Sequence, residues 1–363
     1  MNYEDEWLAE KSSDPRSNDE LIRKLRSLPG NSDEADDAYT VLQARRDPEV
    51  IHRAQEMCRS SDASERRIGA AILSQTGAGS RKILQKECVD TLLALLSHDE
   101  DATVLAMAAL ALGSGYHPDA YEDARISPTL AQVGRHPDAD VRYGVVQGLL
   151  SREDESAVNA MIGLSDDPDE DVRNWATFGL AQQIDADTSE IREALFRRLR
   201  DGSSEIRAEA LLGLARRDDE RVIKPLIREL KKIAKADNYW DMVFEAAATS
   251  GDSRLYPKLA ALRKYIKKND WFAWAIAACR IPKRKESDRV SDGADTTCPV
   301  CGRKNAFSDA DTGFCAKCGW NADIAQHANP DLTGGWNRRS LNEERERWRM
   351  RLKAAGHKNK PRR

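Results

Sequence analysis

Apolar residues recur at helical spacing over most of the chain, and short polar turns interrupt them at nearly regular intervals. One order of residues is found three times between positions 136 and 214: a polar turn, a Val-Arg or Ile-Arg step, and an apolar stretch ending in Gly-Leu. The steps are Val141-Arg142, Val172-Arg173 and Ile206-Arg207, which lie 31 and 34 residues apart. This period predicts stacked helical hairpins, because one hairpin cannot bury its apolar face alone.

Weaker copies of the same order occupy residues 60–73 and 99–112. The turns contain Asp-Pro, Asp-Gly or Ser-Asp, which favour a tight turn and a cap for the helix that follows. These segments resemble HEAT-like repeats of the kind first named in phycobilisome lyases. The resemblance covers roughly residues 35–280. It implies an all-α solenoid, and it carries no specific function.

An arginine recurs at the start of each second helix, at Arg67, Arg142, Arg173 and Arg207. A row of arginines could bind anions along the solenoid. We favour a structural role, in which each arginine pairs with an acidic or carbonyl group of its own or the next repeat, because a residue repeated throughout an array generally serves the repeat. Asp138 and Asp169, four residues before Arg142 and Arg173, are the expected partners.

Small and aromatic residues occupy particular places in the second helices. The small ones should let neighbouring helices approach closely, and they are Gly144, Ala176, Gly179, Ala210 and Gly213. Trp175 and Phe178 stand where the sibling repeats carry smaller side chains. They could mark a contact on the concave face of the solenoid, although local packing is the interpretation we favour.

Two Cys-x-x-Cys-Gly knuckles lie near the end of the chain, with 13 residues between them. Two thiolates at this spacing can reach one metal ion, and a glycine after each knuckle supplies the backbone freedom that the turn needs. A disulfide or redox pair is the alternative to zinc. We predict one structural Zn²⁺ without an open coordination position, held by Cys298, Cys301, Cys315 and Cys318.

The residues around the knuckles resemble the cysteine-rich CPCC family of small bacterial domains. Trp320 follows the second knuckle, and a Gly-Gly-x-Asn loop ending at Asn337 precedes Ser340-Leu341-Asn-Glu343-Glu-Arg345. Val300 stands where the motif of that family has a third cysteine. The resemblance implies a zinc-ribbon-like fold and no reaction. Ser340 and Glu343 also form a capping box, which predicts a C-terminal helix packed on the ribbon.

Composition and turn residues divide the chain into five predicted segments. They are an acidic N-terminal cap (1–34), the HEAT-like solenoid (35–280), a linker without apolar periodicity (281–296), the zinc-binding domain (297–356) and a basic tail (357–363). A second capping box, Ser17 with Glu20, predicts a short helix that ends at Leu28 before Pro29-Gly30.

Charge is distributed unevenly along the chain. Residues 1–220 contain 26 Lys and Arg against 44 Asp and Glu, whereas residues 221–363 contain 31 against 17. Basic and aromatic residues alternate in 221–285, which suits phosphate contact and base stacking, although a solvated outer face is the simpler interpretation. The candidate nucleic-acid contacts are Lys231, Lys232, Lys235, Lys264, Lys267 and Lys268, with the basic tail as a further contact.

Motifs typical of enzymes are scarce. The chain contains no HExxH, no GxSxG and no phosphate-binding P-loop, and it lacks the His-Glu steps of the di-iron HEAT hydroxylases. Some HEAT-like proteins are DNA glycosylases that use a carboxylate beside aromatic residues, so Asp241 and Asp270, each next to a tryptophan, form a remote alternative. We therefore expect a protein that is not an enzyme.

The remaining sequence features concern location and partners. No apolar run is long enough to span a bilayer, and the N-terminal segment lacks the basic and apolar regions of a signal peptide, so we predict a cytoplasmic bacterial protein with no membrane partner. Our functional prediction is a scaffold that grips a protein partner, with the zinc module as a second contact. Nucleic-acid binding through the basic half is the alternative, and a toxin-neutralising immunity protein is a remote one.

Overall fold

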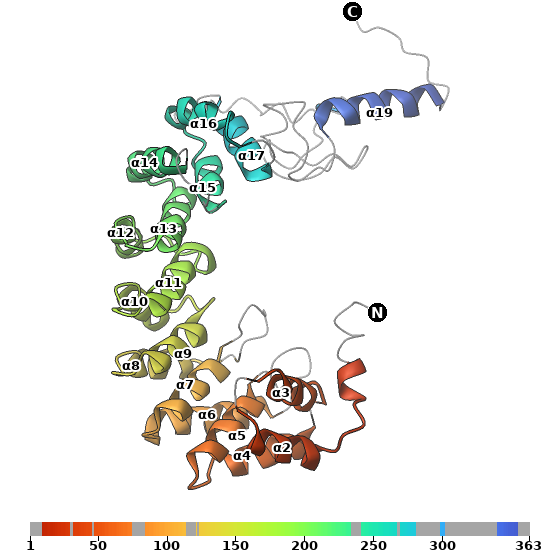
Figure 1. Cartoon of the computed structure of the whole chain (residues 1–363), viewed down its shortest axis with the longest axis vertical. Helices are drawn as coiled ribbons and strands as arrows, with labels where there is room; N and C mark the ends of the chain where they lie inside the picture. Colours follow the sequence, from red (N-terminus) through yellow and green to blue (C-terminus); the bar gives the residue numbers. More distant parts are fainter. Residues whose placement is uncertain are drawn as a thin grey trace, which may run out of the picture. The chain divides into compact units, whose positions relative to one another are not determined.

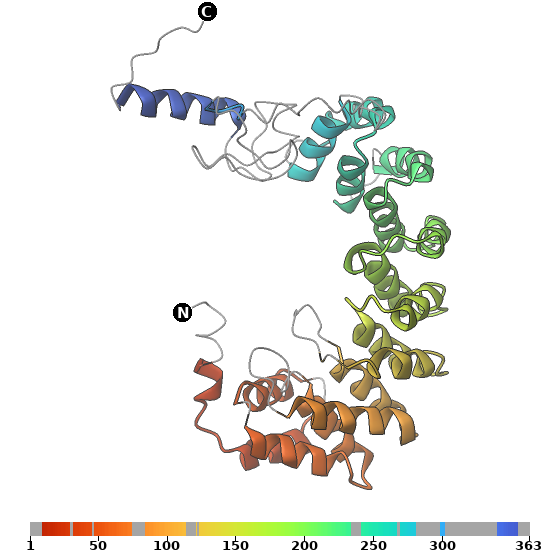
Figure 2. The ribbon, with the colours of Figure 1, turned by 180° about the vertical axis from the view of Figure 1, so that it is seen from behind.

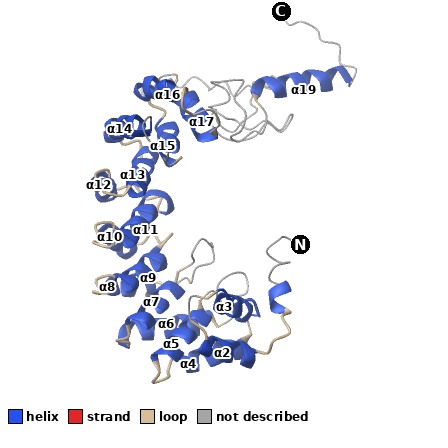
Figure 3. Cartoon of the chain, in the orientation of Figure 1, coloured by secondary structure: helices blue, strands red, loops and turns tan. Residues whose placement is uncertain are grey.

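In the computed structural model every regular element of the described residues is helical (Figure 3), as the all-α prediction required. The described residues are 9–29, 32–45, 47–74, 84–113, 121, 123–233, 241–266, 269–280, 298–301 and 340–354. The predicted linker 281–296 and the basic tail 357–363 lie outside them. The chain divides into two compact units, Met1–Ala194 and Leu195–Arg363. None of the described helices is long and apolar enough to cross a bilayer.

The helices of the first unit form two layers (Figures 1 and 2). After α2 (Asn18–Ser27) and α3 (Asp33–Arg45), the first helices of the hairpins make the A layer, which contains α4 (Pro48–Met57), α6 (Gln85–His98), α8 (Ile126–Val133) and α10 (Glu155–Leu164). The second helices make the B layer, which contains α5 (Ala63–Leu73), α7 (Ala102–Ala111), α9 (Ala139–Leu149) and α11 (Glu170–Phe178). A π-helical turn, η1 (Gly179–Gln183), follows α11, and α12 (Ser189–Arg198) runs across the unit boundary.

Each B helix of the first unit begins at an aspartate. The carboxylates of Asp62, Asp101, Asp138 and Asp169 accept hydrogen bonds from the backbone N–H two residues ahead, at 2.8 to 3.0 Å. Such a bond satisfies one of the free N–H groups at a helix start, and an aspartate there also complements the positive end of the helix dipole. The polar turns therefore cap the helices that follow them, as the sequence predicted.

The B helices approach one another closely where the sequence has glycine. A Cβ on Gly144 would lie only 2.4 Å from the carbonyl oxygen of Ala106 on α7, and one on Gly148 would lie 2.6 Å from that of Ala109. Backbone atoms cannot move away as a side chain can, so α7 and α9 meet at a distance that only glycine permits. The packing role predicted for Gly144 is thus confirmed.

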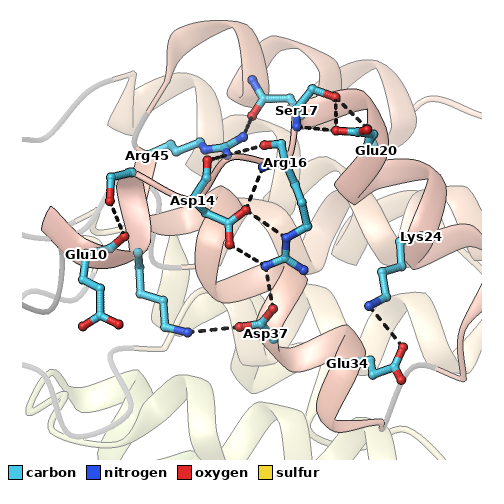
Figure 4. A network of polar contacts seen from close by, with 12 residues as sticks. Glu10, Asp14, Arg16, Ser17, Glu20, Lys24, Glu34, Asp37 and Arg45 are labelled. Carbon is cyan, nitrogen blue, oxygen red and sulfur yellow. Dashed lines mark hydrogen bonds and ion pairs between the residues drawn. The ribbon is translucent and has the colours of Figure 1, made fainter.

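A network of charged groups fixes the N-terminal segment to α3 (Figure 4). Arg16 donates to both carboxylate oxygens of Asp14, at 2.8 and 2.7 Å, and to Asp37 at 2.7 Å. Arg45 reaches from the end of α3 to the carbonyl oxygen of Asp14 at 2.8 Å. The predicted capping box is present at the start of α2, where the Ser17 N–H donates to Glu20 at 2.7 Å.

The second unit repeats the two-layer arrangement. Its described elements are α13 (Ser204–Arg216), η2 (Glu220–Val222), α14 (Ile223–Ile233), α15 (Met242–Ser250), η3 (Ser253–Leu255), α16 (Tyr256–Leu262), α17 (Asp270–Cys279) and α19 (Leu341–Ala354). α15 packs against α13 and α17 on either side. Its Phe244 meets Phe272 of α17 with ring centroids 5.1 Å apart, and both rings are buried.

Candidate functional site: the arginine row, the B-layer face and the cysteine module

The turns before the B helices share one set of polar contacts, which is easiest to follow with a common numbering. We assign repeat position 1 to the residue two before the helix cap, so that position 1 is Ser60, Asp99, His136, Asp167 and Asp201. Position 7 is then Arg66, Leu105, Arg142, Arg173 and Arg207. Nη1 of each position-7 arginine donates to the carbonyl oxygens of positions 1 and 2 in its own turn, at 2.8 to 3.3 Å.

Arg66, Arg142 and Arg207 also bind a carboxylate of the following repeat, and for Arg207 this is Glu229 on α14, 3.2 Å from its Nε. Arg66 Nε lies 2.6 Å from Asp99, and Arg142 Nε lies 2.7 Å from Asp167, each with a second bond from Nη2. Hydrogen bonding to Asp167 raises the pKa of Arg142. Burial opposes ionisation of Asp99, but the bonds from Arg66 and from the Asp101 N–H prevail and its pKa is lowered.

The structural interpretation of the arginine row is therefore confirmed, with two corrections. The first arginine of the row is Arg66, whereas the predicted Arg67 interacts with Tyr39. The carboxylate partner of Arg142 is Asp167 of the next repeat, because the nearer Asp138 uses its carboxylate to cap α9. Guanidinium groups bound on two sides in this way are not available to an incoming anion.

One step of the row is interrupted at both of its ends. Position 7 of α7 is Leu105, and position 1 of the following repeat is His136 where its neighbours have aspartate. His136 keeps the local contact of that position, since its Nδ1 accepts from the Asp138 N–H at 3.1 Å. At this step both the arginine and the aspartate of the inter-repeat ion pair are replaced. The joint replacement agrees with a structural role, in which each arginine is present to bind the aspartate of the next repeat.

Positions 8 and 12 of the B helices lie on the helix face opposite the buried positions 6 and 10. On α7, α9 and α11 these positions are Ala106 and Leu110, Tyr143 and Gln147, and Asn174 and Phe178. We refer to these six residues, together with Trp175, as the B-layer face. Leu110 is 38% exposed, which is high for leucine in a helical core.

The predicted contact residues Trp175 and Phe178 belong to this face. Their rings meet edge to face, with centroids 5.5 Å apart and an interplanar angle of 80°. Both side chains are half-buried, so each still presents part of its ring to solvent. Sequence analysis missed Leu110, Tyr143, Gln147 and Asn174, and the signal that finds them is the alignment of positions 8 and 12 across repeats.

An open groove of about 630 Å³ in the first unit is lined by residues of α5 and α6 and of the turn after α4. It is lined by Cys58, Arg66, Asp90, His98 and Asp99, among others. Arg66 and Asp99 bind each other, and Asp90 pairs with Lys86 and with Arg125. Burial raises the pKa of Cys58 to about 12, so this thiol is not a nucleophile.

The first cysteine knuckle lies against the start of α19. Cys298 is buried and Cys301 half-buried, and Arg345 of α19 donates to the carbonyl oxygen of Pro299 between them at 2.9 Å. The predicted capping box is present, with Ser340 N–H to Glu343 at 2.9 Å and Glu343 N–H to Ser340 at 3.2 Å. Cys315 and Cys318 lie outside the described residues.

A complete metal site cannot be traced among the residues with described positions, where no group of three or more His, Cys, Asp or Glu side chains converges. The two cysteines that are described do suit a soft divalent metal, since they come from a single turn and one of them, Cys298, is buried.

The candidate basic contacts lie at the C-terminal ends of two A-type helices of the second unit. Lys231 is exposed, Lys232 pairs with Glu229 at 2.7 Å, and Lys264 lies 4.7 Å from the centroid of the Tyr265 ring. Lysine at a helix C-terminus also complements the helix dipole, which is a structural reason for these positions. Lys235, Lys267 and Lys268 lie outside the described residues.

The two carboxylates of the glycosylase alternative occupy helix starts. Asp241 precedes α15 and accepts a hydrogen bond from the amide of Asn269 at 2.6 Å. Asp270 is exposed in the first turn of α17, and its neighbour Trp271 packs against Trp274, with ring centroids 5.1 Å apart. The positions of both carboxylates are therefore explained by their location at helix starts and by the packing of the adjacent tryptophans.

Family models and solved structures agree with this architecture. A model of HEAT repeats matches residues 89–181 and 160–250, and a model of the cysteine-rich CPCC domain matches residues 296–357. Protein YibA of Escherichia coli K12 is 31% identical over 271 residues, which cover 72% of this chain and 90% of that protein, and YibA of E. coli O157:H7 matches equally.

The X-ray structure of E. coli YibA superposes with a TM-score of 0.58 at 26% identity, covering 77% of this chain and 97% of the other. Both resemblances inferred from the sequence, to HEAT-like repeats and to the CPCC domain, are confirmed. The chain belongs to the family of HEAT-repeat proteins that includes E. coli YibA.

Proposed function

We propose that this protein is a non-enzymatic scaffold whose HEAT repeats bind a protein partner. The observation that carries the proposal is the B-layer face, where Leu110, Tyr143, Trp175 and Phe178 present apolar and aromatic surface on successive helices. Repeat packing is already provided by positions 6 and 10, such as Val141 and Val145, which are fully buried. Aromatic and apolar side chains left at a solvent boundary are typical of protein interfaces.

The charge of the first unit favours protein over nucleic acid at this face. Residues 1–194 contain 20 Lys and Arg against 38 Asp and Glu. A phosphate backbone would be repelled by this excess of carboxylates, whereas a protein surface of opposite charge would be attracted.

The cysteine module is proposed as a second contact that depends on one structural Zn²⁺. Cys298, Cys301, Cys315 and Cys318 would supply four thiolates, and such a site holds a fold together without activating water. Support comes from the buried Cys298 and from Arg345, which ties α19 to the first knuckle. Elemental analysis of protein purified without added metal should find one zinc per chain, and a folded module without metal would refute the site.

Nucleic-acid binding by the second unit is the second candidate, and it rests on Lys264 beside Tyr265, which is 55% exposed. Lys231→Glu, Lys232→Glu and Lys264→Glu together should weaken binding to any duplex and lower the salt slope by about one for each phosphate that is no longer bound. Absence of duplex binding by the unmodified protein at low salt removes this candidate.

Affinity purification of the full chain from its source organism tests the main proposal. The lysate is treated with nuclease, and excess random duplex is added before elution and mass spectrometry. We expect the same protein to be retained with and without both treatments. Loss of every retained protein after nuclease treatment, or no retained protein at all, would overturn the scaffold function.

A further inference from the structure

The B-layer face contains polar groups that the fold leaves without partners. Nε2 of Gln147 on α9 and Oδ1 of Asn174 on α11 are shielded from water, and neither has a hydrogen-bond partner in the described structure. Gln147 as a whole is only 9% exposed. A shielded donor or acceptor without a partner lowers stability, so each such group in a native protein calls for a specific explanation, such as an ordered water or a group of a binding partner.

These two amides stand between apolar side chains on neighbouring helices. Leu110 and Gln147 both occupy position 12, one repeat apart, and Phe178 occupies it in the next repeat. The π-helical turn Gly179–Gln183 begins directly after Phe178, and such turns are frequent at functional sites. The B-layer face thus combines apolar side chains with one hydrogen-bond donor, Nε2 of Gln147, and one acceptor, Oδ1 of Asn174.

The charged groups on the same side of these helices are acidic. Asp140 and Asp171 both occupy position 5, are exposed, and form no ion pair within the described part of the chain. Arg142 and Arg173 of the same helices are bound to carbonyl oxygens, and Arg142 also to Asp167. Arg152, which follows α9, donates to the carbonyl oxygens of Gly148 and Leu112. Asp140 and Asp171 are therefore exposed carboxylates without an ion-pair partner in the described structure.

We propose that α7, α9 and α11 bind an extended, basic segment of the protein partner, in which apolar residues alternate with Lys or Arg. The segment's main-chain carbonyl would accept from Gln147 and its N–H would donate to Asn174, after rotation of the terminal amide torsions, which are broad. Its apolar side chains would contact Leu110, Tyr143 and Phe178, and its cations would pair with Asp140 and Asp171. This inference rests on the scaffold function proposed above and names its ligand chemistry.

The dimensions suit an extended segment. Packed helices lie about 8–10 Å apart, so three consecutive B helices span roughly 20 Å. An extended chain advances about 3.3 Å per residue and places alternate side chains on one side. About six residues would cross the face, with every second side chain directed toward it.

The direct test is fluorescence anisotropy of labelled peptides of about ten residues. The probe alternates Leu or Tyr with Lys, a first control peptide carries Glu in place of each Lys, and a second carries Gly in place of each apolar residue. We expect the full chain to bind the first peptide and neither control. Equal binding of the Glu peptide, or no binding of the Lys peptide, would overturn the inference, as would displacement of the peptide by random duplex DNA.

Two double variants locate the site. Asp140→Lys with Asp171→Lys should weaken binding of the Lys peptide by about tenfold or more. The matched control is Glu87→Lys with Glu155→Lys, which makes the same charge change at exposed first-turn positions of A-layer helices and should leave the affinity within about twofold. Equal losses in both variants would show a non-specific charge effect and refute the site.

The amides need a variant that keeps the fold intact. Gln147→Leu with Asn174→Leu removes both unpartnered groups at nearly constant volume, so the thermal stability should stay unchanged or rise while peptide affinity falls about tenfold. A fall in stability with unchanged affinity would assign these amides to the fold. If the Asp140→Lys, Asp171→Lys chain still retains the partner found by affinity purification, the scaffold function stands and this inference fails.

Discussion

At the scale of single residues, the position-7 arginines show how one side chain closes a turn and joins two repeats. The sequence predicted the structural role of the row and three of its members, but it named Arg67 where the structure has Arg66. It misplaced the carboxylate partner of Arg142, because Asp167 lies 25 residues away and reaches Arg142 only once the hairpins have stacked. The nearer Asp138 satisfied the helical four-residue rule but was already used as a cap.

Removing Asp167 should therefore be costly. Asp167→Ala leaves the largely buried Arg142 without its carboxylate and removes the bond to the Asp169 N–H, so we expect a loss of about 2 kcal/mol or more in unfolding free energy, measured by urea titration. Asp171→Ala, in the same turn but exposed, should change it by less than about 0.5 kcal/mol. Equal effects of the two changes would contradict the assigned role of Asp167.

The buried thiols give a second prediction at this scale. Burial raises the pKa of Cys58 to about 12 and that of Cys88 to about 11, so at pH 8 almost none of either thiol is the reactive thiolate. Ellman's reagent should label them only after unfolding in urea, with Cys58→Ala and Cys88→Ala used to assign the signals. Fast labelling of either cysteine in the native protein would show that the repeats open readily.

At the scale of helices, the starts were predictable and some of the ends were not. Aspartate caps and the Ser17–Glu20 box mark helix starts in the sequence, and the structure places them where they were expected. The π-helical turn after Phe178 has no such local mark. Its first residue, Gly179, packs so closely that a Cβ there would lie 2.2 Å from Cε of Met161 on α10. The close contact of α7 and α9 was foreseen only because small residues recur in the repeats.

Alanine substitutions at two glycines, Gly144 and Gly163, distinguish the effect of close helix packing on stability from the effect of helix propensity. Gly144→Ala would place a Cβ 2.4 Å from the Ala106 carbonyl oxygen, so we expect a loss of about 1–3 kcal/mol in unfolding free energy. Gly163→Ala in α10 meets nothing within 4 Å and should raise stability by about 0.5–1 kcal/mol. Thermal and urea unfolding of both variants measure the difference, and a stable Gly144→Ala protein would refute the close helix contact.

At the scale of the whole molecule, the chain combines an acidic repeat unit with a basic C-terminal part that carries the cysteine module. The sequence predicted the solenoid and the four cysteine ligands from spacing alone. It singled out Trp175 and Phe178 but missed Leu110 and Gln147, because Leu110, Gln147 and Phe178 lie 37 and 31 residues apart and share a surface only after the helices stack. Of the proposed ligands, Cys298 and Cys301 are described in place, and the full zinc set stays a prediction.

Zinc removal should act on the module and leave the repeats intact. Cys298→Ser is expected to abolish stoichiometric zinc, because three thiolates no longer close the site, and to unfold the small module. The main thermal transition of the helical repeats should move by less than about 2 °C, since the repeats have their own core. Calorimetry and circular dichroism would test this, and a large shift of the main transition would show that the module stabilises the repeats.

The central claim is that the B layer of the first unit binds a protein partner. Hydrogen–deuterium exchange of the full chain, with and without the partner recovered by affinity purification, tests it most directly. The account predicts new protection in peptides spanning Ala139–Leu149 and Glu170–Phe178. Protection confined to residues of the second unit, with α9 and α11 unchanged by the partner, would contradict it.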